Sequence, residues 1–294
     1  MKTRQIFVIA LVSAITSTSF FAQDAKSFTL KIGGYASAQV VDNSHPNPQA
    51  FHAGDVYGTF RPEITYQDGT TKYFLEADFA SVEVPKMNWM KELYVEQNLG
   101  NGFFFRVGRF KNGWIYVLPP AKFDPTVIDA RVYTSYFGTG ARLTKVAGPW
   151  TITADLTGDT LPCFQVRDSF ENPEGTFRTM YTVSKELFFG ATVQGAKDVS
   201  RGMCDFTYAR ADGLTTKVVF EKYDDRKKNG QDLYVYTGKR VKNLEIHAMV
   251  DLFEHNRTFT TIGVRVFAGK SWDGTIDYRF DQHHTVMARV RYLL

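Results

Sequence analysis

The sequence predicts an all-β protein, a transmembrane antiparallel up-and-down β-barrel of about 16 strands. Polar and apolar residues alternate almost continuously after residue 25, which is the period of a strand with two different faces. Aromatic residues make up 15% of the chain, with 25 Phe and 15 Tyr, and Tyr and Trp favour membrane–water interfaces. A soluble β-sandwich also alternates, but hairpins in series and many charges on the polar face favour the barrel.

The last run of the chain illustrates the pattern from which each strand is predicted. Val286, Val290 and Tyr292 fall on one face, while Arg289 and Arg291 fall on the other. In a barrel the first face meets lipid and the second meets water. Sixteen such runs cover approximately 28–41, 55–67, 71–83, 89–99, 102–110, 136–146, 149–158, 177–185, 187–196, 202–210, 214–223, 231–241, 243–252, 258–267, 273–281 and 284–294.

Short turns and longer connections alternate between these runs, as they do in outer-membrane barrels with an even number of strands. The short turns and both chain termini are then expected on the periplasmic side, and the longer connections on the extracellular side. Pro62 lies inside the second run, where it lacks a ladder N–H and marks a bulge or a bend. The turns are predicted at 68–69, 100–102, 146–148, 211–213 and 241–243, and the longer connections at 42–54, 111–135, 159–176, 197–201 and 224–230.

The N-terminal segment has the order of a secretory signal. Lys2 and Arg4 precede an apolar run over residues 6–15, and a Ser/Thr stretch ends at Ala22. A helical membrane anchor would need about 20 apolar residues, which is longer than this run. The sequence therefore predicts a signal peptide over residues 1–22 and one outer-membrane β-barrel domain over residues 23–294.

The charged face of the runs is predicted to line a pore. A barrel of about sixteen strands is wide enough for a water-filled channel, whereas eight strands fill their own interior. Basic and acidic residues are equally numerous on this face, so no overall ion preference is expected. Acidic residues crowd the second to fourth runs and arginines the last three, and opposed sectors of this kind would set a field across the pore. Alternatively, many of these charges are ion-paired wall residues. The candidate lining and selectivity residues are Arg61, Glu76, Asp78, Glu92, Glu96, Arg106, Arg142, Arg265, Arg289 and Arg291.

Two connections contain further candidate features. The segment 111–135 is apolar and contains prolines, so we expect it to fold into the lumen and narrow it; packing on the rim or against a neighbouring subunit is the alternative. Cys163 and Cys204 are expected near adjacent extracellular connections, where a disulfide is possible and free thiols are the alternative. No CxxC spacing or His/Cys cluster indicates a metal, and no cofactor is expected.

Three consecutive stretches resemble the phosphate-selective porin O and P family: FLEADF at 74–79, KELYVE at 91–96 and GFFFRVGRFK at 102–111. That family shows an acidic strand, a Tyr-containing strand, a Gly turn, and an Arg/Lys strand that leads into a long Pro-containing loop. The resemblance implies a sixteen-stranded, often trimeric diffusion channel whose phosphate sites use lumen arginines and lysines. Arg106, Arg109 and Lys111 lie in the matching motif, which adds Arg109 and Lys111 to the candidate lining residues.

The sequence thus predicts a porin in the outer membrane of a Gram-negative bacterium, a passive channel for small hydrophilic solutes or ions, with anions such as phosphate among them. Its partners would be outer-membrane lipids, solutes and further copies in a homotrimer; the net charge of +4 gives no indication of nucleic-acid binding. The alternatives are a barrel with a hydrolase activity and one with a structural or adhesive role. No serine stands two residues after any histidine, and His247 near Asp251 is interpreted as a wall residue, so no enzyme activity is expected.

Overall fold

The structure is a computed structural model that describes residues 28–43, 55–77, 79–80, 90–111, 136–158, 161–162, 173–196, 199–225, 228–253, 257–280 and 285–293. The predicted signal peptide over residues 1–22 lies outside the described residues. So do Asp78, Cys163 and the greater part of the segment 111–135, for which a constricting role is predicted.

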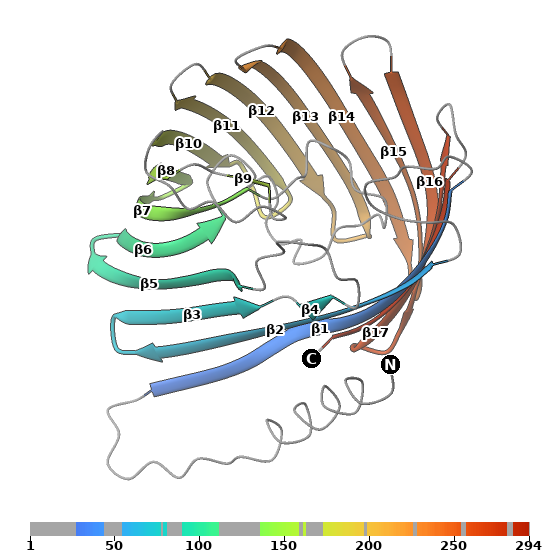
Figure 1. Ribbon diagram of the computed structural model, residues 1–294, viewed down its shortest axis with the longest axis horizontal. Coiled ribbons are helices and arrows are strands. Elements are labelled where there is room, and N and C mark those ends of the chain that lie inside the picture. Colours follow the sequence, from blue (N-terminus) through green and yellow to red (C-terminus); the bar gives the residue numbers. More distant parts are fainter. Residues whose placement is uncertain are drawn as a thin grey trace.

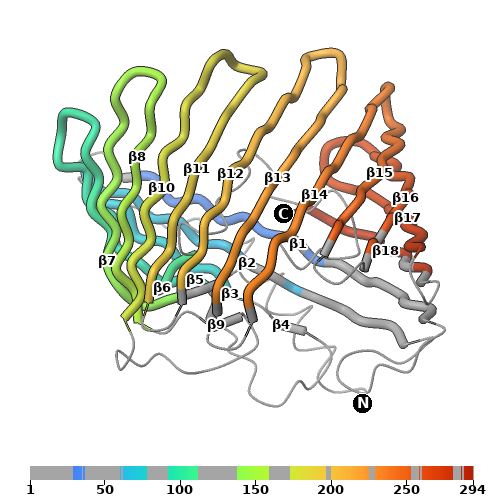
Figure 2. The backbone as a smooth tube through the Cα atoms, turned by 90° about the horizontal axis from the view of Figure 1, so that it is seen from above, coloured from blue at the N-terminus to red at the C-terminus, as the bar shows by residue number. Residues whose placement is uncertain are grey.

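Sixteen antiparallel strands form a barrel within the described residues (Figures 1 and 2). Each strand pairs with its two neighbours in sequence, and β1 pairs with β18 from Tyr35↔Leu293 to Asn43↔Thr285, so the ring of pairings is continuous. Two of the sixteen are described in two pieces, since β3 and β4 both pair with β2, and β8 and β9 both pair with β7. The strands are β1 (Phe28–Asn43), β2 (Asp55–Asp68), β3 and β4 (Thr71–Ala77 and Phe79–Ala80), β5 (Met90–Gly100), β6 (Phe103–Lys111), β7 (Tyr136–Ala147), β8 and β9 (Trp150–Thr157 and Leu161–Pro162), β10 (Glu174–Thr182), β11 (Leu187–Ala196), β12 (Val199–Ala209), β13 (Leu214–Asp225), β14 (Lys228–Val241), β15 (Leu244–Phe253), β16 (Arg257–Ala268), β17 (Trp272–Phe280) and β18 (Thr285–Leu293).

These strands confirm the predicted fold class, and each of the sixteen predicted runs coincides with one of them. The differences lie at strand ends. β10, β12 and β14 each begin three residues earlier than predicted, at Glu174, Val199 and Lys228. These ends are polar or glycine-rich and show no alternation, but each pairs with the strand beside it. Pairing with a neighbour satisfies backbone groups whatever the side chains are.

Pro62 lies inside β2, where a bulge or a bend was predicted. It stays within β2, opposite Gly34 of β1, whose φ is 122°. On its other side β2 pairs with β3 as far as Glu63 and resumes with β4 at Phe60, in the same register. Asp78, which separates β3 from β4, lies outside the described residues. The unchanged register on both sides of Pro62 shows no bulge in the described pairings, and a bend at this residue stays a prediction.

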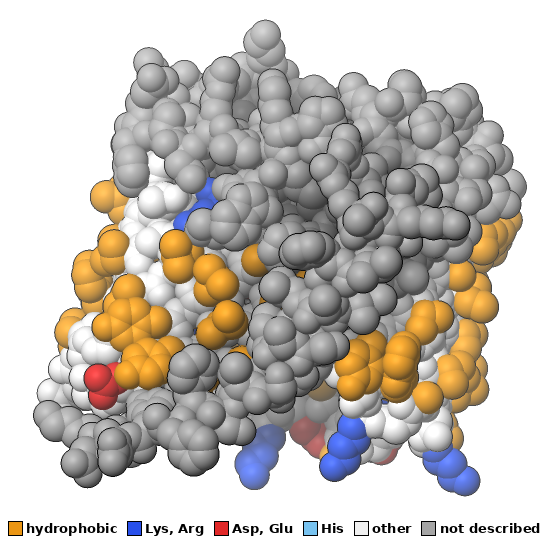
Figure 3. All heavy atoms as spheres, turned by 60° about the horizontal axis from the view of Figure 1, so that its bottom comes forward, with side chains coloured by type: hydrophobic (Ala, Val, Ile, Leu, Met, Phe, Trp, Pro, Cys, Tyr) orange, Lys and Arg blue, Asp and Glu red, His pale blue; other side chains and the backbone are white. Residues whose placement is uncertain are grey.

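The two faces of the wall differ as the alternation predicts. On β6 the exposed side chains Phe103, Phe105 and Val107 alternate with Phe104 and Arg106 on the inner face. Large apolar side chains are also exposed on the outer face of other strands, from Leu30 on β1 to Val290 on β18. Figure 3 shows hydrophobic side chains gathered on both flanks of the molecule, with lysine and arginine side chains beyond their lower edge.

Aromatic pairs mark the end of the barrel at which the short turns lie. Trp150 and Tyr181 have ring centroids 4.6 Å apart, and Trp272 and Tyr292 have centroids 4.7 Å apart. All four belong to the outward-facing series of their strands, next to the turns. A ring of this kind is typical of the level at which lipid headgroups meet water.

A charged contact ties the turn between β12 and β13 to the end of β14. Lys239 Nζ lies 2.9 Å from Asp212 Oδ2 and donates to the Asp212 carbonyl at 3.1 Å. The hydrogen bond from Lys239 lowers the pKa of the Asp212 carboxyl, and the bond from the Leu214 N–H acts in the same direction. Because this pKa falls on folding, the contact stabilises the fold above the unfolded pKa of the carboxyl and is lost as pH falls through the lowered folded pKa.

Candidate functional site

Ion pairs join neighbouring strands along the inner wall. Arg106 on β6 donates from Nε and Nη2 to Oε2 of Glu96 on β5, at 2.9 and 2.6 Å. Arg142 on β7 donates from Nε and Nη2 to the two carboxylate oxygens of Asp155 on β8, both at 2.7 Å. The second pair is the more buried, with side chains 6% and 0% exposed against 16% and 18% for the first. These contacts agree with the alternative that wall charges are ion-paired.

The two arginines are direct cross-strand neighbours, since Arg106 stands opposite Arg142. Like charges in this position repel each other. Each guanidinium has its own carboxylate on the far side, and each also lies over an aromatic ring, Arg106 at 3.9 Å from the centroid of Tyr94 and Arg142 at 4.7 Å from that of Phe110. These contacts hold the two groups side by side in fixed orientations.

Arg178 on β10 reaches across β11 to Asp205 on β12. Its Nη1 and Nη2 lie 2.6 and 3.0 Å from the two carboxylate oxygens, and Nη1 also donates to Thr192 Oγ1 at 2.7 Å. The pair crosses directly over Gly190, where an added Cβ would overlap both charged groups. A strand that passes beneath an ion pair therefore needs a glycine at the crossing point.

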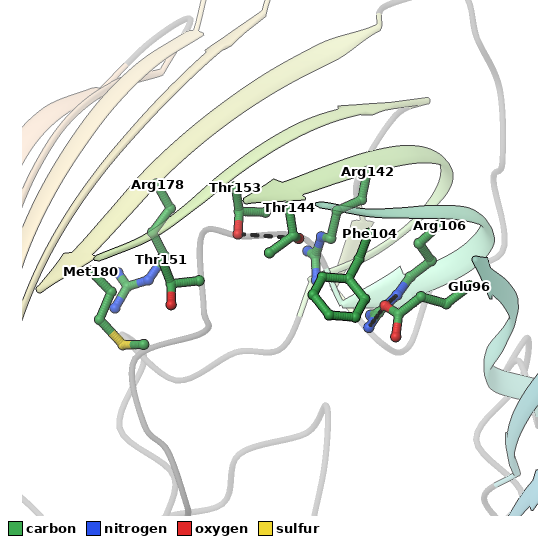
Figure 4. Close-up of a pocket in the computed structure, with 9 residues that line it drawn as sticks. All are labelled: Glu96, Phe104, Arg106, Arg142, Thr144, Thr151, Thr153, Arg178 and Met180. Carbon is green, nitrogen blue, oxygen red and sulfur yellow. Dashed lines mark hydrogen bonds and ion pairs between the residues drawn. The ribbon is translucent and has the colours of Figure 1, made fainter. Parts of the chain in front are cut away.

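A recess of about 240 Å³ opens on the inner wall between these pairs (Figure 4). Phe104, Arg106 and Arg142 border it on one side, and Arg178 and Met180 border it on the other. Three threonines lie between the two sides: Thr144, Thr151 and Thr153. The recess exists because short side chains stand between long ones on a regular wall.

Three carboxylates share one rung on the neighbouring strands. Glu63 of β2 stands opposite Glu76 of β3, which stands opposite Glu92 of β5. Lys111 at the end of β6 lies against them, with Nζ 3.8 Å from Glu76 and 3.9 Å from Glu92, and its backbone N–H donates to Glu92 at 3.0 Å. The predicted acidic crowding on the second to fourth strands is thus a row of cross-strand neighbours with a lysine beside it.

Arginines gather on the last three strands around one carboxylate. Asp273 of β17 accepts from Arg265 of β16 at 3.0 Å and from Arg291 of β18 at 2.9 and 3.1 Å. Arg289 stands on the same face of β18, two residues before Arg291. Basic groups outnumber the carboxylate in this group, in contrast to the one-to-one pairs of β5 to β12.

The two charge sectors lie close together in the closed ring, and the predicted field across the pore stays a prediction. β1 pairs with both β18 and β2, so closure of the ring brings the arginine sector of β16 to β18 next to the acidic sector of β2 to β5. Sequence order placed these sectors at the two ends of the chain. The continuous ring of pairings places them about a quarter of the circumference apart.

His247 is bonded to a different aspartate from the one that the sequence indicated. Its Nε2 lies 2.8 Å from Oδ1 of Asp277 on β17, and both side chains are 0% exposed. The contact passes over Gly263 of β16, where a Cβ would overlap both groups. Asp251 is four residues from His247 along β15, and four residues of strand span about 13 Å. The buried pair supports the interpretation of His247 as a wall residue.

Three candidate lining residues are not found on the described inner wall. The side chain of Arg61 lies outside the described residues, as does Asp78. Arg109 is buried, but it pairs in register with the exposed Leu93 and follows the alternation of the exposed Val107. Alternation therefore places Arg109 on the face of β6 opposite to that of Arg106.

Cys204 is a free and exposed thiol on the outer face of β12. β12 begins at Val199, so Cys204 lies within the strand, as in the predicted run over 202–210. Its alternation with the buried Met203 and Asp205 turns it outward. The proposed partner Cys163 lies outside the described residues, so the disulfide stays a prediction.

Sequence reasoning missed the uncharged residues of the recess and the acceptor Asp273. The predicted lining residues are all charged, so the threonines of the recess are not among them. The available signal was their position: Thr144 and Thr153 each stand two residues from a charged neighbour on the same face, Arg142 and Asp155. Asp273 was missed because it is the first polar residue of its strand.

Two features are absent from the described residues. These residues contain no group of three or more His, Cys, Asp or Glu side chains that could hold a metal ion. They also contain no helix that is long and apolar enough to cross a membrane.

The fold is similar to that of solved porins. A mutant of the Rh. blastica porin matches with a TM-score of 0.66 at 13% sequence identity, over 90% of this chain and 100% of that one. Salmonella typhi OmpF, in a complex with daunomycin, matches with a TM-score of 0.67 at 12% identity, over 90% and 97% of the two chains. No family model and no curated protein matches the sequence. The likeness establishes a sixteen-stranded porin-like barrel, and it does not confirm the phosphate-selective family.

Proposed function

We propose that this chain is an outer-membrane diffusion channel for small hydrophilic solutes. One observation carries the proposal: around the ring of described strands, large apolar side chains are exposed on the outer face, while the buried ion pairs lie on the inner wall. In a soluble barrel the arrangement would be reversed, because the core needs apolar side chains and the surface polar ones.

The physical requirements of a membrane support the same proposal. A strand in lipid must pair along both edges, and each described strand has two partners in a ring that closes through β1 and β18. The aromatic pairs at the turn end provide an anchor at one interface. An inner wall with this many charged side chains is stable only in contact with water or with its own counter-charges.

The inner wall supports passage of both anions and cations. Along β5 to β12 each arginine described above has its own carboxylate, so this part of the wall offers little excess charge. The resemblance to phosphate-selective porins makes phosphate one of the anions that we propose as solutes. We further propose export through residues 1–22 and assembly as a homotrimer, which size-exclusion chromatography with light scattering in detergent would test.

In a planar bilayer the purified chain should give stable single-channel steps. Because charges of both signs line the wall in similar numbers, the reversal potential in a tenfold KCl gradient should lie near zero, well short of the roughly 59 mV of an ideally selective pore. Heat-denatured protein from the same preparation is the control. Repeated silence from barrels that retain their β-structure would contradict the proposed function.

The outward position of Cys204 gives an independent test of the membrane assignment. In a Cys163→Ser background, an environment-sensitive fluorophore on Cys204 should emit at shorter wavelength in lipid vesicles and should be quenched by lipid-soluble nitroxides. The matched control carries Cys204→Ala and Thr207→Cys, since Thr207 is a buried inner-face residue of the same strand. We expect its label to respond to water-soluble quenchers instead. Identical responses from the two sites would show that β12 does not separate lipid from water.

A further inference from the structure

We propose that the recess between β5 and β10 binds small organic monocarboxylates, that is, molecules with a single carboxylate on a compact apolar body. The inference rests on the proposed function, because such a solute reaches the recess from the water-filled interior. The recess lies on the inner wall toward the turn end, since Phe104, Thr151 and Met180 are each within two residues of a strand end there.

The register of the strands gives the recess its shape. Phe104, Thr144, Thr153 and Arg178 form one continuous rung across β6, β7, β8 and β10. The two threonines in the middle are short, and their hydroxyl oxygens lie 3.5 Å apart. The residues at the two ends are long. A solute can therefore lie against the threonines with Phe104 on one side and the Arg178 side chain on the other (Figure 4).

Hydrogen-bond donors are concentrated on the next rung. Arg106 and Arg142 stand opposite each other and both border the recess. Each uses Nε and Nη2 for its carboxylate partner, and among the hydrogen bonds of the described residues neither uses Nη1. Two adjacent guanidinium groups, already held by aromatic rings, offer these remaining N–H groups without reorganisation. The ligand that fits them carries acceptors only, as a carboxylate does.

Charge balance favours a monocarboxylate over a multiply charged inorganic anion. The three arginines of the recess are matched by Glu96, Asp155 and Asp205, so these six groups sum to zero. A site without excess charge selects by hydrogen bonds and shape, and here the shape includes the apolar surfaces of Phe104 and Met180. The volume of about 240 Å³ lies below the roughly 300–1,000 Å³ of sites for drug-sized ligands, so the solute is small.

Binding should be weak, because a solute that passes through a channel must also leave it. We expect benzoate to bind the detergent-folded full chain with a Kd on the order of 1 mM by ligand-observed NMR titration. Three further probes distinguish the contribution of the apolar body from that of the carboxylate. Acetate lacks the apolar body, benzyl alcohol lacks the charge, and inorganic phosphate lacks the apolar body and carries more charge. Each should bind at least about tenfold more weakly, the equivalent of 1.4 kcal/mol. Phosphate binding as tight as that of benzoate, or equal binding of benzyl alcohol, would overturn the assignment.

Variants test whether the recess is the binding site. Thr153→Leu fills the recess without changing any charge and should weaken benzoate binding at least about tenfold. Phe104→Ala should reduce benzoate to the affinity of acetate. Thr215→Leu places the same bulk on the inner face of β13, outside the recess, and should leave the affinity unchanged. Equal benzoate affinity in the parent and in Thr153→Leu would overturn the proposal.

The binding measurement needs no ion current, which keeps the two proposals separate. Benzoate binding that is lost in Thr153→Leu, from barrels that do not conduct, would support the recess and contradict the channel. Conducting barrels whose benzoate affinity is the same in the parent and in Thr153→Leu would support the channel and contradict the recess.

Discussion

Replacement of Gly263 by alanine should lower the free energy of unfolding by about 2–4 kcal/mol, an unusually large effect for one added methyl group. The Cβ at this position would overlap both His247 Nε2 and Asp277 Oδ1, which are bonded at 2.8 Å directly above the glycine. Both side chains are 0% exposed, so neither has solvent to turn towards. The substitution must therefore part a buried hydrogen-bonded pair or shift β16 away from it.

Urea unfolding in lipid vesicles, followed by tryptophan fluorescence, would measure this loss. Gly195→Ala on β11 is the matched control, since a Cβ there meets nothing within 4 Å, and we expect a change within about 0.5 kcal/mol. Gly263→Ala should also cost less in a His247→Ala background than in the parent, because removal of the ring makes room for the methyl group. Equal stability of the parent and Gly263→Ala would contradict the crossing-point role of the glycine.

Most of the fold could be predicted from the alternation of polar and apolar residues, because the two-residue period of a strand is a local property of the sequence. Each inward residue is followed by an outward one, so the faces of β6 or β15 can be assigned without knowledge of any partner strand. Strand ends could not be assigned in this way. The residues at 228–230 are polar on both faces, and they are in β14 only because β13 pairs with them.

Some contacts of the inner wall could be predicted from the sequence, and others could not. Glu96 and Arg106 flank a predicted hairpin turn, and their position opposite each other follows from that turn. Arg178 and Asp205 are 27 residues apart and meet across an intervening strand, which no hairpin predicts. The available signal is a glycine in the inward series of the middle strand, such as Gly190 or Gly263. An inward glycine indicates that two side chains from the flanking strands meet above it.

The charge sectors could be predicted from the sequence because each lies on consecutive strands. The arginines of β16 to β18 and the carboxylates of β2 to β5 stand near the two ends of the chain. A closed barrel makes the first and last strands neighbours. In a closed ring, strands that are half of the chain apart lie on opposite walls. Strands at the two ends of the chain lie next to each other.

The second large effect is expected at Arg142, whose replacement by alanine should lower the free energy of unfolding by about 3–5 kcal/mol. The substitution leaves the fully buried Asp155 carboxylate without its two 2.7 Å hydrogen bonds, and it removes the bond at 2.6 Å to the Lys111 carbonyl. Arg106→Ala is the matched control, with the same chemistry one strand away. The side chain of its partner Glu96 is 18% exposed and can be hydrated, so we expect Arg106→Ala to lower the free energy of unfolding by about 1 kcal/mol.

The double variant Arg142→Ala/Asp155→Ala distinguishes the stabilisation by the ion pair from the free-energy penalty of an unpaired buried carboxylate. Removal of both partners takes away the buried carboxylate as well, so the double variant should be more stable than Arg142→Ala alone. Arg142→Lys should recover little, because a lysine presents one ammonium group where Asp155 and the Lys111 carbonyl need a planar fork of donors. Losses at Arg142 and Arg106 of the same size, by the same vesicle measurement, would show that burial does not set the strength of these wall pairs.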